Sequence, residues 1–371
     1  MSNFFLDLPA MGWHPFFEAY YAELAAELSV KPLVPARIVA GFQDLYRVAF
    51  VGGEAMAELS GRFRYQLTQA TDWPAVGDWV LLHWPETAQP DQDRGVIHGV
   101  LPRRSAFSRV QAGTQGKGQV VAANVDTLWV VTSLNHDLNL RRIERYLTLA
   151  WESRAEPVIV LNKADSAGED LAAALAALQG VALGCEVLAV SALHQRGLSQ
   201  LEPWLKPGHT LAMVGSSGVG KSTLLNALMG TEAMATGSIR VDDSKGKHTT
   251  THRELFRLPQ GAWLMDTPGM RELRLTASEH GLAMSFEDID ALAQQCRFRN
   301  CHHGEDVGCA VQAAIDAGEL APERLASFVK QHKENDWQLR RESPELRARS
   351  KQRFKHITKA MRKQAKGSSP A

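Results

Sequence analysis

The sequence predicts a multidomain α/β protein with a small N-terminal β-barrel, a central α/β domain and a C-terminal helical domain. Short segments rich in strand-forming residues alternate with turns from about residue 36 to 104, which predicts the barrel. Buried strands then alternate with helices from about residue 125 to 265, which predicts a mostly parallel sheet. Three cysteines and a histidine cluster among helical segments beyond residue 280, which predicts a small domain stabilised by a metal.

The length of 371 residues allows several domains, each with its own core. Hydrophobic residues make up 44% of the chain and charged residues 22%, as in ordinary globular proteins. We place the domains at 1–35 (a helical extension), 36–110 (the barrel), 111–280 (the α/β domain), 281–340 (the metal domain) and 341–371 (a basic tail).

Nothing in the sequence indicates secretion or a membrane span. The N-terminus lacks the positive region and apolar core of a signal peptide, and the apolar stretch at 171–185 is too short and alanine-rich to cross a bilayer. The four cysteines do not form a disulfide framework, since three fall within fourteen residues. We therefore expect a reduced, cytoplasmic protein without a membrane partner.

The net charge of zero hides an uneven distribution. From Arg340 onward, eleven basic residues face two acidic ones, so this segment carries nine net positive charges and the remainder nine negative. One face of a helix in this segment carries Lys351, Lys355, Lys359 and Lys363. Another face carries the apolar residues Phe354, Ile357 and Met361. This basic amphipathic helix suits RNA or an acidic membrane surface, and a merely solvated helix is the plainer alternative.

Residues 1–104 predict one helix followed by five short strands. The helix is expected around 14–28, and the strands at 37–40, 46–51, 57–61, 78–82 and 95–100. Five such strands predict an OB-type barrel, with an SH3-like barrel as the alternative. OB barrels often bind RNA on one face. The candidate contacts are the basic or aromatic residues Arg62, Phe63, Arg64, Arg103, Arg104, Phe107 and Arg109. A charged rim that only contacts solvent is an equal explanation for them.

Residues 105–120 are rich in glycine, serine and glutamine, which predicts a linker. The α/β domain follows. Strands are expected at 125–131, 157–161, 186–190, 210–214 and 262–265, and helices around 140–153, 168–179, 197–204 and 221–230. In the last domain, helices are expected at 286–295, 310–317 and 322–339.

A phosphate-binding loop lies between the strand at 211–214 and the helix that begins near Thr223. Its residues are Gly215, Ser216, Ser217, Gly218, Val219, Gly220, Lys221, Ser222 and Thr223. Glycines let backbone N–H groups close around phosphate oxygens, and the helix N-terminus adds its positive dipole. We expect Lys221 to reach the β and γ phosphates and the Ser222 hydroxyl to bind Mg²⁺. The segment therefore predicts nucleoside triphosphate binding.

A second motif, Asn162-Lys163-Ala164-Asp165, follows a buried strand at the end where ligands bind in α/β sheets. A carboxylate at Asp165 accepts hydrogen bonds from the ring N–H and exocyclic amine of guanine, a pair that adenine does not offer. Ser191 and Ala192 end the next strand and are expected to back the base. The combination predicts GTP rather than ATP and disfavours a P-loop kinase.

Asp266-Thr267-Pro268-Gly269 ends a later strand, so Asp266 is expected to hold Mg²⁺ through water and the Gly269 N–H to sense the γ-phosphate. The polar loop at 246–252 is a candidate switch, in which a threonine such as Thr250 completes the magnesium shell.

Ordinary GTPases carry a water-orienting glutamine where this chain has Met270. His248 is the candidate replacement, and an ordinary exposed histidine is the alternative.

The order of these motifs is permuted, because the base-reading motif precedes the phosphate loop. The central domain is therefore predicted to be a circularly permuted P-loop GTPase domain with a mostly parallel sheet. The metal ligands follow it. Cys296, Cys301, His303 and Cys309 supply three thiolates and one imidazole, which predicts one structural Zn²⁺. His302 is an adjacent rival ligand, and Cys185 lies far away in the sequence.

With these motifs in this order, the chain resembles the RsgA (YjeQ) family of circularly permuted GTPases from about residue 36 to 340. The resemblance implies an OB domain, a GTPase domain and a zinc domain. It also implies late maturation of the small ribosomal subunit, contact with its rRNA, slow GTP hydrolysis stimulated by the subunit, and release of assembly factors such as ribosome-binding factor A. We expect a monomer that binds GTP, GDP and Mg²⁺. The alternative is a nucleotide-gated RNA-binding module with little turnover.

Overall fold

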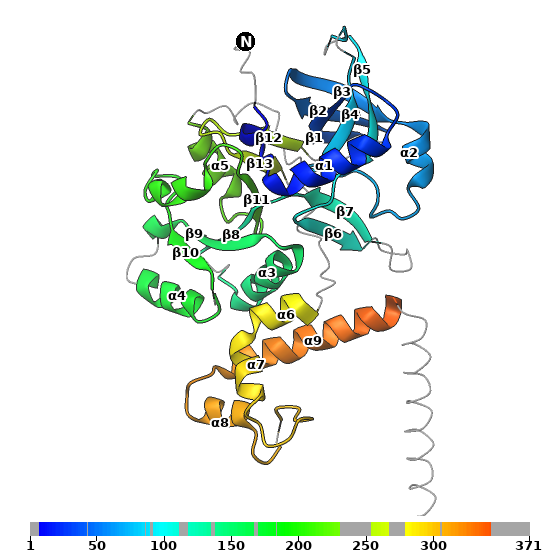
Figure 1. Cartoon of the computed structure of the whole chain (residues 1–371). Helices are drawn as coiled ribbons and strands as arrows, with labels where there is room; N and C mark the ends of the chain where they lie inside the picture. Colours follow the sequence, from blue (N-terminus) through cyan, green and yellow to red (C-terminus); the bar gives the residue numbers. More distant parts are fainter. Residues whose placement is uncertain are drawn as a thin grey trace, which may run out of the picture. The chain divides into compact units, whose positions relative to one another are not determined.

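The structure is a computed structural model. It describes residues 7–42, 44–85, 87–89, 92–110, 118–134, 138–166, 170–182, 184–230, 254–266, 279–304 and 306–342. The chain divides into two compact units, of which the first comprises Met1–Arg109 and Gly118–Leu273 and the second comprises Val110–Lys117 and Arg274–Ala371. The first unit contains the barrel and the α/β sheet, and the second contains the helices that follow residue 278 (Figure 1) together with the cysteine cluster.

The barrel consists of the five expected strands. They are β1 (Leu33–Phe42), β2 (Leu45–Phe50), β3 (Gly53–Leu59), β4 (Trp79–His83) and β5 (Arg94–Val100). Their order is β1-β2-β3-β5-β4, and β4 pairs with β1 to close the barrel. β3 and β5 are parallel and the other pairs antiparallel, so the barrel is of the OB type rather than the SH3-like alternative.

The N-terminal extension covers the barrel with a short 3₁₀ turn (η1, Pro9–Met11) and the expected helix α1 (Pro15–Glu27). Proline suits the first helical position, and the His14 side chain accepts a hydrogen bond from the Phe16 backbone to cap the helix. Phe17 is fully buried, with its ring 6.0 Å from that of Trp79. The extension is thus part of the barrel core.

Two expectations for this region are wrong. Residues 105–120 are not a linker throughout, because β6 (Ala106–Val110) and β7 (Gly118–Ala123) form a two-stranded sheet. Two candidates for the RNA face are structural instead. Phe107 is fully buried, and Arg103 donates to both carboxylate oxygens of Asp78 at 2.8 and 2.7 Å. A short helix, α2 (Gly61–Gln66), follows β3 and carries Arg62 and Arg64.

The α/β part has strand order β10-β9-β8-β11-β13-β12. The strands are β8 (Thr127–Ser133), β9 (Glu156–Asn162), β10 (Glu186–Ala189), β11 (Thr210–Val214), β12 (Glu254–Arg257) and β13 (Trp263–Asp266). All pairs are parallel except β12 with β13. β12 was not expected. Its antiparallel pairing with β13 leaves the sheet mostly parallel, in line with the predicted fold class.

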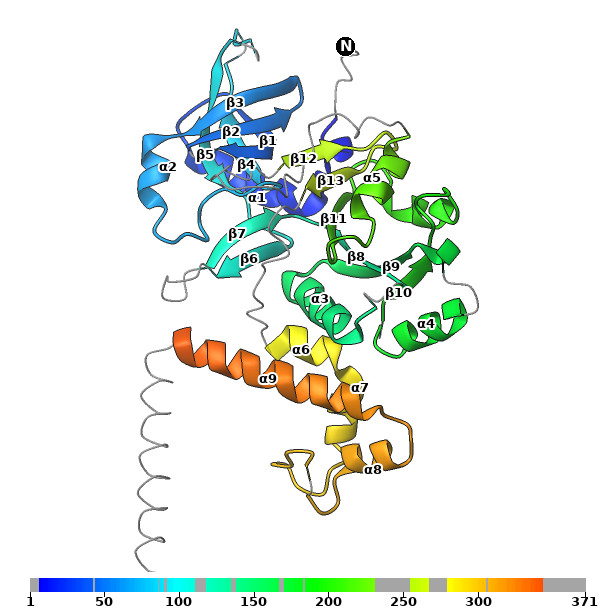
Figure 2. The same cartoon turned by 180° about the vertical axis from the view of Figure 1, so that it is seen from behind.

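Helices cover both sides of this sheet. In both views α3 (Leu140–Ser153) and α4 (Asp170–Gln179) lie on one side and α5 (Lys221–Met229) on the other (Figures 1 and 2). The segment at Leu198–Trp204, where a helix was expected around 197–204, is a 3₁₀ helix with Pro203 inside it. The core beneath the phosphate loop contains Trp129, Val160, Val219 and Leu224.

The barrel and the α/β sheet are continuous, because β12 pairs with β1 as well as with β13. Arg37 of β1 strengthens this junction, since its buried guanidinium donates to Met11 O (2.6 Å), Thr210 Oγ1 (2.7 Å) and Asn124 O (3.3 Å). Burial lowers the pKa of Arg37 to about 10. One side chain therefore connects the N-terminal extension, the barrel and the α/β sheet.

The second unit is helical, with α6 (Glu279–Ser285), α7 (Glu287–Ala293), α8 (Ala310–Asp316) and α9 (Pro322–Glu342). Its core contains Leu282, Phe286, Ile289 and Val311. Arg324 fixes α9 to α7 by donating to both carboxylate oxygens of Asp288 at 2.8 and 2.9 Å. The predicted basic amphipathic helix lies outside the described residues. No helix in the described part of the chain is both long and apolar enough to cross a membrane.

Candidate nucleotide and metal sites

The phosphate loop lies at the carboxyl edge of the sheet, where β8, β9, β11 and β13 all end. Gly215 and Gly220 have φ of +150° and +93°. A Cβ atom at these positions would lie 2.2 Å from Val131 O and 2.3 Å from Asn162 Nδ2, respectively. Only glycine fits such close approaches, so the loop residues are determined by packing as well as by backbone conformation.

Two cations contact the loop itself. Lys221 Nζ donates to Gly215 O (2.7 Å) and Ser216 O (2.6 Å), so its ammonium lies over the concave side of the loop. Arg142, near the start of α3, donates to Ser216 Oγ. The sequence motifs did not identify Arg142, because no local pattern indicates a contact across 74 positions of sequence. Positive charge thus surrounds a loop built to bind anionic phosphate.

Asn162 links the base-reading motif to the phosphate loop. Its Nδ2 atom donates to Val219 O (3.0 Å) and Gly220 O (3.3 Å), while its Oδ1 accepts from Ala192 N (3.0 Å). Lys163 adds a second link, since Nζ donates to Gly218 O at 2.6 Å. The two motifs, about fifty residues apart in sequence, therefore form one rigid cradle with the segment at Ser191-Ala192.

Asp165 lies in a short 3₁₀ turn that begins at Ala164. Ser191 Oγ donates to its carboxylate, and His194 Nε2 lies 3.5 Å from it. The hydrogen bond from Ser191 lowers the pKa of Asp165 below its ordinary value. The carboxylate is consequently ionised at neutral pH, as an acceptor for two guanine donors must be. His194 is a further residue that the sequence motifs did not identify.

The remaining predicted residues lie around the same edge. Ser222 is exposed at the second position of α5, with Thr223 beside it, and Asp266 is the last residue of β13. His248, Thr250, Gly269 and Met270 lie outside the described residues. The structure therefore brings together the phosphate loop, the base-reading motif and the strand end at Asp266.

The second unit gathers Cys296, Cys301, His303 and Cys309, whose ligand atoms all lie within 4.8 Å of one another. The Cys296–Cys309 sulfur distance is 3.9 Å, and His303 Nδ1 lies 3.7 and 3.6 Å from these sulfurs. Tetrahedral Zn²⁺ with bonds of about 2.0–2.3 Å places its ligands roughly 3.5–3.8 Å apart, so the cluster fits zinc. Neither His302 nor Cys185 belongs to it.

Backbone contacts hold these ligands in place. Ala310 N donates to Cys296 Sγ and Gln312 N to Cys309 Sγ, both at 3.4 Å. Gln312 Nε2 donates to the His303 carbonyl at 2.7 Å, which fixes a residue with a left-handed φ of +54°. Burial lowers the pKa of His303, which favours the neutral ring that can offer a lone pair to a metal.

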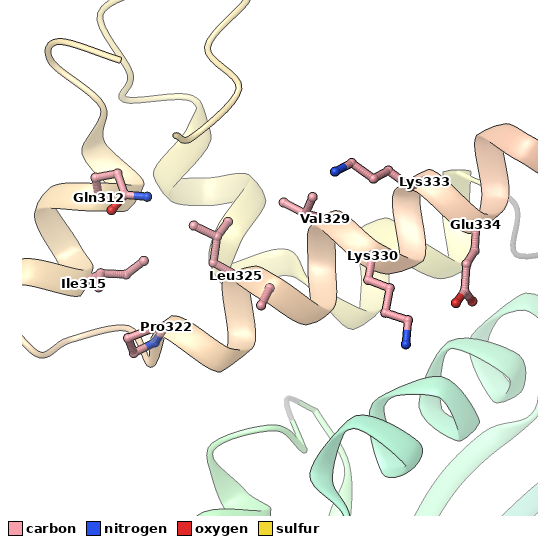
Figure 3. A pocket seen from close by; sticks show the side chains of 9 residues that line it. Gln312, Ile315, Pro322, Leu325, Val329, Lys330, Lys333 and Glu334 are labelled. Carbon is pink, nitrogen blue, oxygen red and sulfur yellow. The ribbon is translucent and has the colours of Figure 1, made fainter. Parts of the chain in front are cut away.

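A groove of about 870 Å³ in the second unit is separate from these ligands. Apolar side chains of α8 and α9 form its floor, and Lys330, Lys333 and Glu334 lie along it (Figure 3). None of its lining residues belongs to a nucleotide motif or to the cysteine cluster. It is an open apolar surface between two helices and contains no grouping typical of a catalytic site.

A phosphate loop, an Asn-Lys-Ala-Asp motif and an aspartate at the end of the neighbouring strand, all at one sheet edge, are the arrangement of P-loop GTPases, here in circularly permuted order. The model of the RsgA GTPase family matches residues 100–276. A relative from Opitutus terrae called "Small ribosomal subunit biogenesis GTPase RsgA" is 42% identical over 362 residues, covering 96% of this chain and 97% of the relative. The chain belongs to the RsgA family.

Other comparisons agree with this assignment. A relative from Lactiplantibacillus plantarum, "Small ribosomal subunit biogenesis GTPase RsgA 2", is 45% identical and covers 81% of this chain and 83% of the relative. The crystal structure of YjeQ from Thermotoga maritima has a TM-score of 0.61 at 28% identity, covering 82% of this chain and 99% of that one. YloQ, described as a circularly permuted GTPase, shares the fold with a TM-score of 0.59 at 22% identity.

Proposed function

We propose that this chain is a GTPase that binds the small ribosomal subunit during its biogenesis and hydrolyses GTP slowly until the subunit stimulates it. The observation that carries the proposal is the cradle formed by Asn162, which joins the guanine-reading motif to the phosphate loop at one sheet edge. The names of relatives that match 96% and 81% of the chain support the ribosomal part.

In this proposal Asp165 selects guanine, and the loop at 215–223 holds the phosphates. The backbone N–H groups of the loop donate to phosphate oxygens. Lys221, now bonded to the carbonyls of Gly215 and Ser216, turns toward the β and γ phosphates when nucleotide enters. Ser191 and Ala192 complete the base pocket.

Mg²⁺ would neutralise charge on the phosphates during transfer to water. Ser222 and Asp266 are the proposed holders of this ion, with Thr250 completing the shell and the Gly269 N–H responding to the γ-phosphate. His248 is proposed to orient the attacking water, since Met270 has no group that can do so. The positions of Ser222 at the start of α5 and Asp266 at the end of β13 support the first two assignments.

The zinc domain and the barrel are the proposed contacts to rRNA. One structural Zn²⁺ held by Cys296, Cys301, His303 and Cys309 would fix the loop that joins α7 to α8. The basic tail beyond Arg340 adds positive charge for the same polyanion. We propose that the protein acts as a cytoplasmic monomer and promotes the release of assembly factors from the subunit.

Single-turnover GTP hydrolysis with and without purified small subunits tests the proposal. We expect small subunits to accelerate hydrolysis and large subunits to have no comparable effect. The Lys221→Ala variant serves as the control that loses nucleotide binding. The His248→Ala variant is expected to retain GTP affinity within a few-fold and to lose roughly ten- to a thousand-fold of the stimulated rate. Absence of stimulation by small subunits would contradict the main proposal.

Met270 motivates a second candidate, a nucleotide-gated RNA-binding module that scarcely hydrolyses GTP. Co-sedimentation with small subunits in GTP, GDP and a non-hydrolysable analogue separates the two functions. A gated binder associates in the GTP form and stays bound, whereas a stimulated GTPase associates with the analogue and dissociates as GTP is consumed.

A further inference from the structure

One row of residues crosses the junction between the barrel and the nucleotide sheet. Arg47 of β2 lies opposite Ala40 of β1, and Ala40 lies opposite Glu254, the first residue of β12. Glu254 in turn lies opposite Asp266, the last residue of β13. The row therefore begins in the barrel and ends at the proposed magnesium residue.

Directly opposed residues in antiparallel strands place their side chains on the same face of the sheet. Arg47 and Glu254 consequently lie on the same face of the sheet as Ala40, one on each side of it. The small Ala40 side chain leaves the space between them open. The Arg47 guanidinium spans that space and pairs with the Glu254 carboxylate. A shift of register in β1 between Ile38 and Ala40 lies at the same place, where one edge of β1 changes its partner from β4 to β12 while the other edge stays paired with β2.

The guanidinium has a second acidic neighbour within the barrel. Arg47 Nε lies 3.5 Å from Glu54 Oε2 of β3. One cation therefore joins a carboxylate of β3 to a carboxylate of β12, across β2 and β1. The Arg47 and Glu254 side chains are 34% and 48% exposed, so the direct energy of the pair is small and its main effect is to fix position.

We propose that Arg47 and Glu254 are positioning residues for magnesium-dependent GTP hydrolysis, because they fix β12 to the barrel and thereby hold the end of β13 in register. β12 and β13 share four register pairs, and the pair at Glu254 and Asp266 is the one nearest the nucleotide edge. Loss of the ion pair frees β12 at that end, so Asp266 is held less well for the metal. The inference rests on the proposed function of Asp266.

Mg²⁺ titration of single-turnover GTP hydrolysis tests this inference in the full-length protein. The Glu254→Gln variant keeps the shape of the side chain and removes its charge. We expect the Mg²⁺ concentration for half-maximal rate to rise about three- to fivefold, the size of effect that a partly exposed ion pair has. GDP affinity measured in a chelator stays unchanged, because the phosphate loop and Asp165 are untouched.

Exchanging the charges of Arg47 and Glu254 is the decisive experiment. Arg47→Glu alone leaves three carboxylates together and is expected to raise the Mg²⁺ requirement at least as much as Glu254→Gln. The double variant Arg47→Glu with Glu254→Arg restores an ion pair, so its requirement should return to within about twofold of the wild type. A merely local packing role would not give this reciprocal rescue.

Arg94→Glu is the matched control, because Arg94 is an exposed arginine of β5 in the same barrel and no described contact joins it to the nucleotide sheet. The inference is overturned if the Glu254 and Arg47 variants match Arg94→Glu in Mg²⁺ requirement, or if the double variant fails to recover. A wild-type protein that binds no GTP, or hydrolyses it without Mg²⁺, would instead overturn the proposed function on which the inference rests.

Discussion

Asp165 shows how a single side chain is prepared for its role. The residue type was predictable from the motif, but its electrostatic state depends on Ser191, 26 positions further along the chain. The Ser191 hydroxyl lowers the pKa of the carboxyl and orients it, so no proton is lost when guanine binds. If Asp165 selects the base as proposed, selectivity requires the end of β10 to be correctly placed beside the end of β9.

We predict that Asp165→Asn weakens GTP binding roughly 10- to 100-fold, because an amide presents a donor to one of the two guanine donors. Binding of xanthosine triphosphate should improve, since xanthine offers an acceptor there. Competition against a fluorescent guanine nucleotide measures both affinities. Asp316→Asn, the same change at an exposed aspartate of α8, is the control. Unchanged GTP affinity in Asp165→Asn would show that the guanine assignment is wrong.

The contacts made by Arg142 and Asn162 show what residue-level prediction lacks. Motif spacing identifies Asn162 as part of a base-reading segment, yet its bonds to Val219 and Gly220 appear only when β9 and β11 lie in one sheet. Arg142 belongs to no motif and reaches Ser216 because α3 packs beside the phosphate loop. Such partners depend on tertiary packing and leave no local pattern in the sequence.

At the scale of elements, the loop between α7 and α8 would depend on metal ligation for much of its structure. Cys296, Cys301 and His303 all precede α8, and Cys309 caps its first turn. α7 and α8 have seven residues each, too few to be stable alone. Zinc at this cluster would therefore supply much of the stability of the second unit.

Cys301→Ser is accordingly expected to abolish zinc binding and to unfold this unit, while GTP binding to the first unit persists. Metal content by atomic absorption, far-UV circular dichroism and GTP affinity should be measured on one preparation. The matched control is Cys185→Ser, which changes a cysteine outside the cluster. A zinc-free Cys301→Ser protein with a fully folded second unit would contradict the structural role of the metal.

Elements with a clear hydrophobic pattern in the sequence were predicted well. Strands that are defined by their pairing with other strands were not. β8, β9 and β11 are continuous buried runs, and the sequence located each within a few residues. β6 and β7 were assigned to a linker because three glycines dominate residues 113–118, whereas their pairing with each other makes them strands. β12 has four residues, of which one is buried, so its pairing with β13 and β1 defines it.

The molecule as a whole depends on a junction that no motif indicates. The sequence predicted a helix at 14–28 but no role for the extension that carries it. Arg37 and Trp263 supply that role, because the Trp263 indole donates to Ala10 O at 2.9 Å and Arg37 donates to Met11 O. The turn at Pro9–Met11 thus fits between the barrel and β13, and these two hydrogen bonds join it to both.

Arg37→Met is expected to destabilise the first unit by about 2–4 kcal/mol, because it leaves buried carbonyl and hydroxyl acceptors without a donor. The thermal midpoint of that unit should fall by about 5–10 °C, and the N-terminal extension should become sensitive to protease. Differential scanning calorimetry and limited proteolysis measure the two effects.

Arg104→Met is the control for this change. The Arg104 side chain is 38% exposed, so its loss should alter stability by no more than about 0.5 kcal/mol. If Arg37→Met matches this control in both measurements, Arg37 is not the connection that the structure indicates.

The two indoles around Arg37 have a spectroscopic consequence. The guanidinium carbon lies 5.9 Å from the centre of the Trp79 ring and 6.0 Å from that of Trp263, so one fixed cation faces a fluorophore of the barrel and one of β13. Indole emission energy responds to nearby charge, and Trp263 is three residues before Asp266. Intrinsic fluorescence therefore gives the protein a native optical signal at its junction, which Trp263→Phe would separate from the emission of the other eight tryptophans.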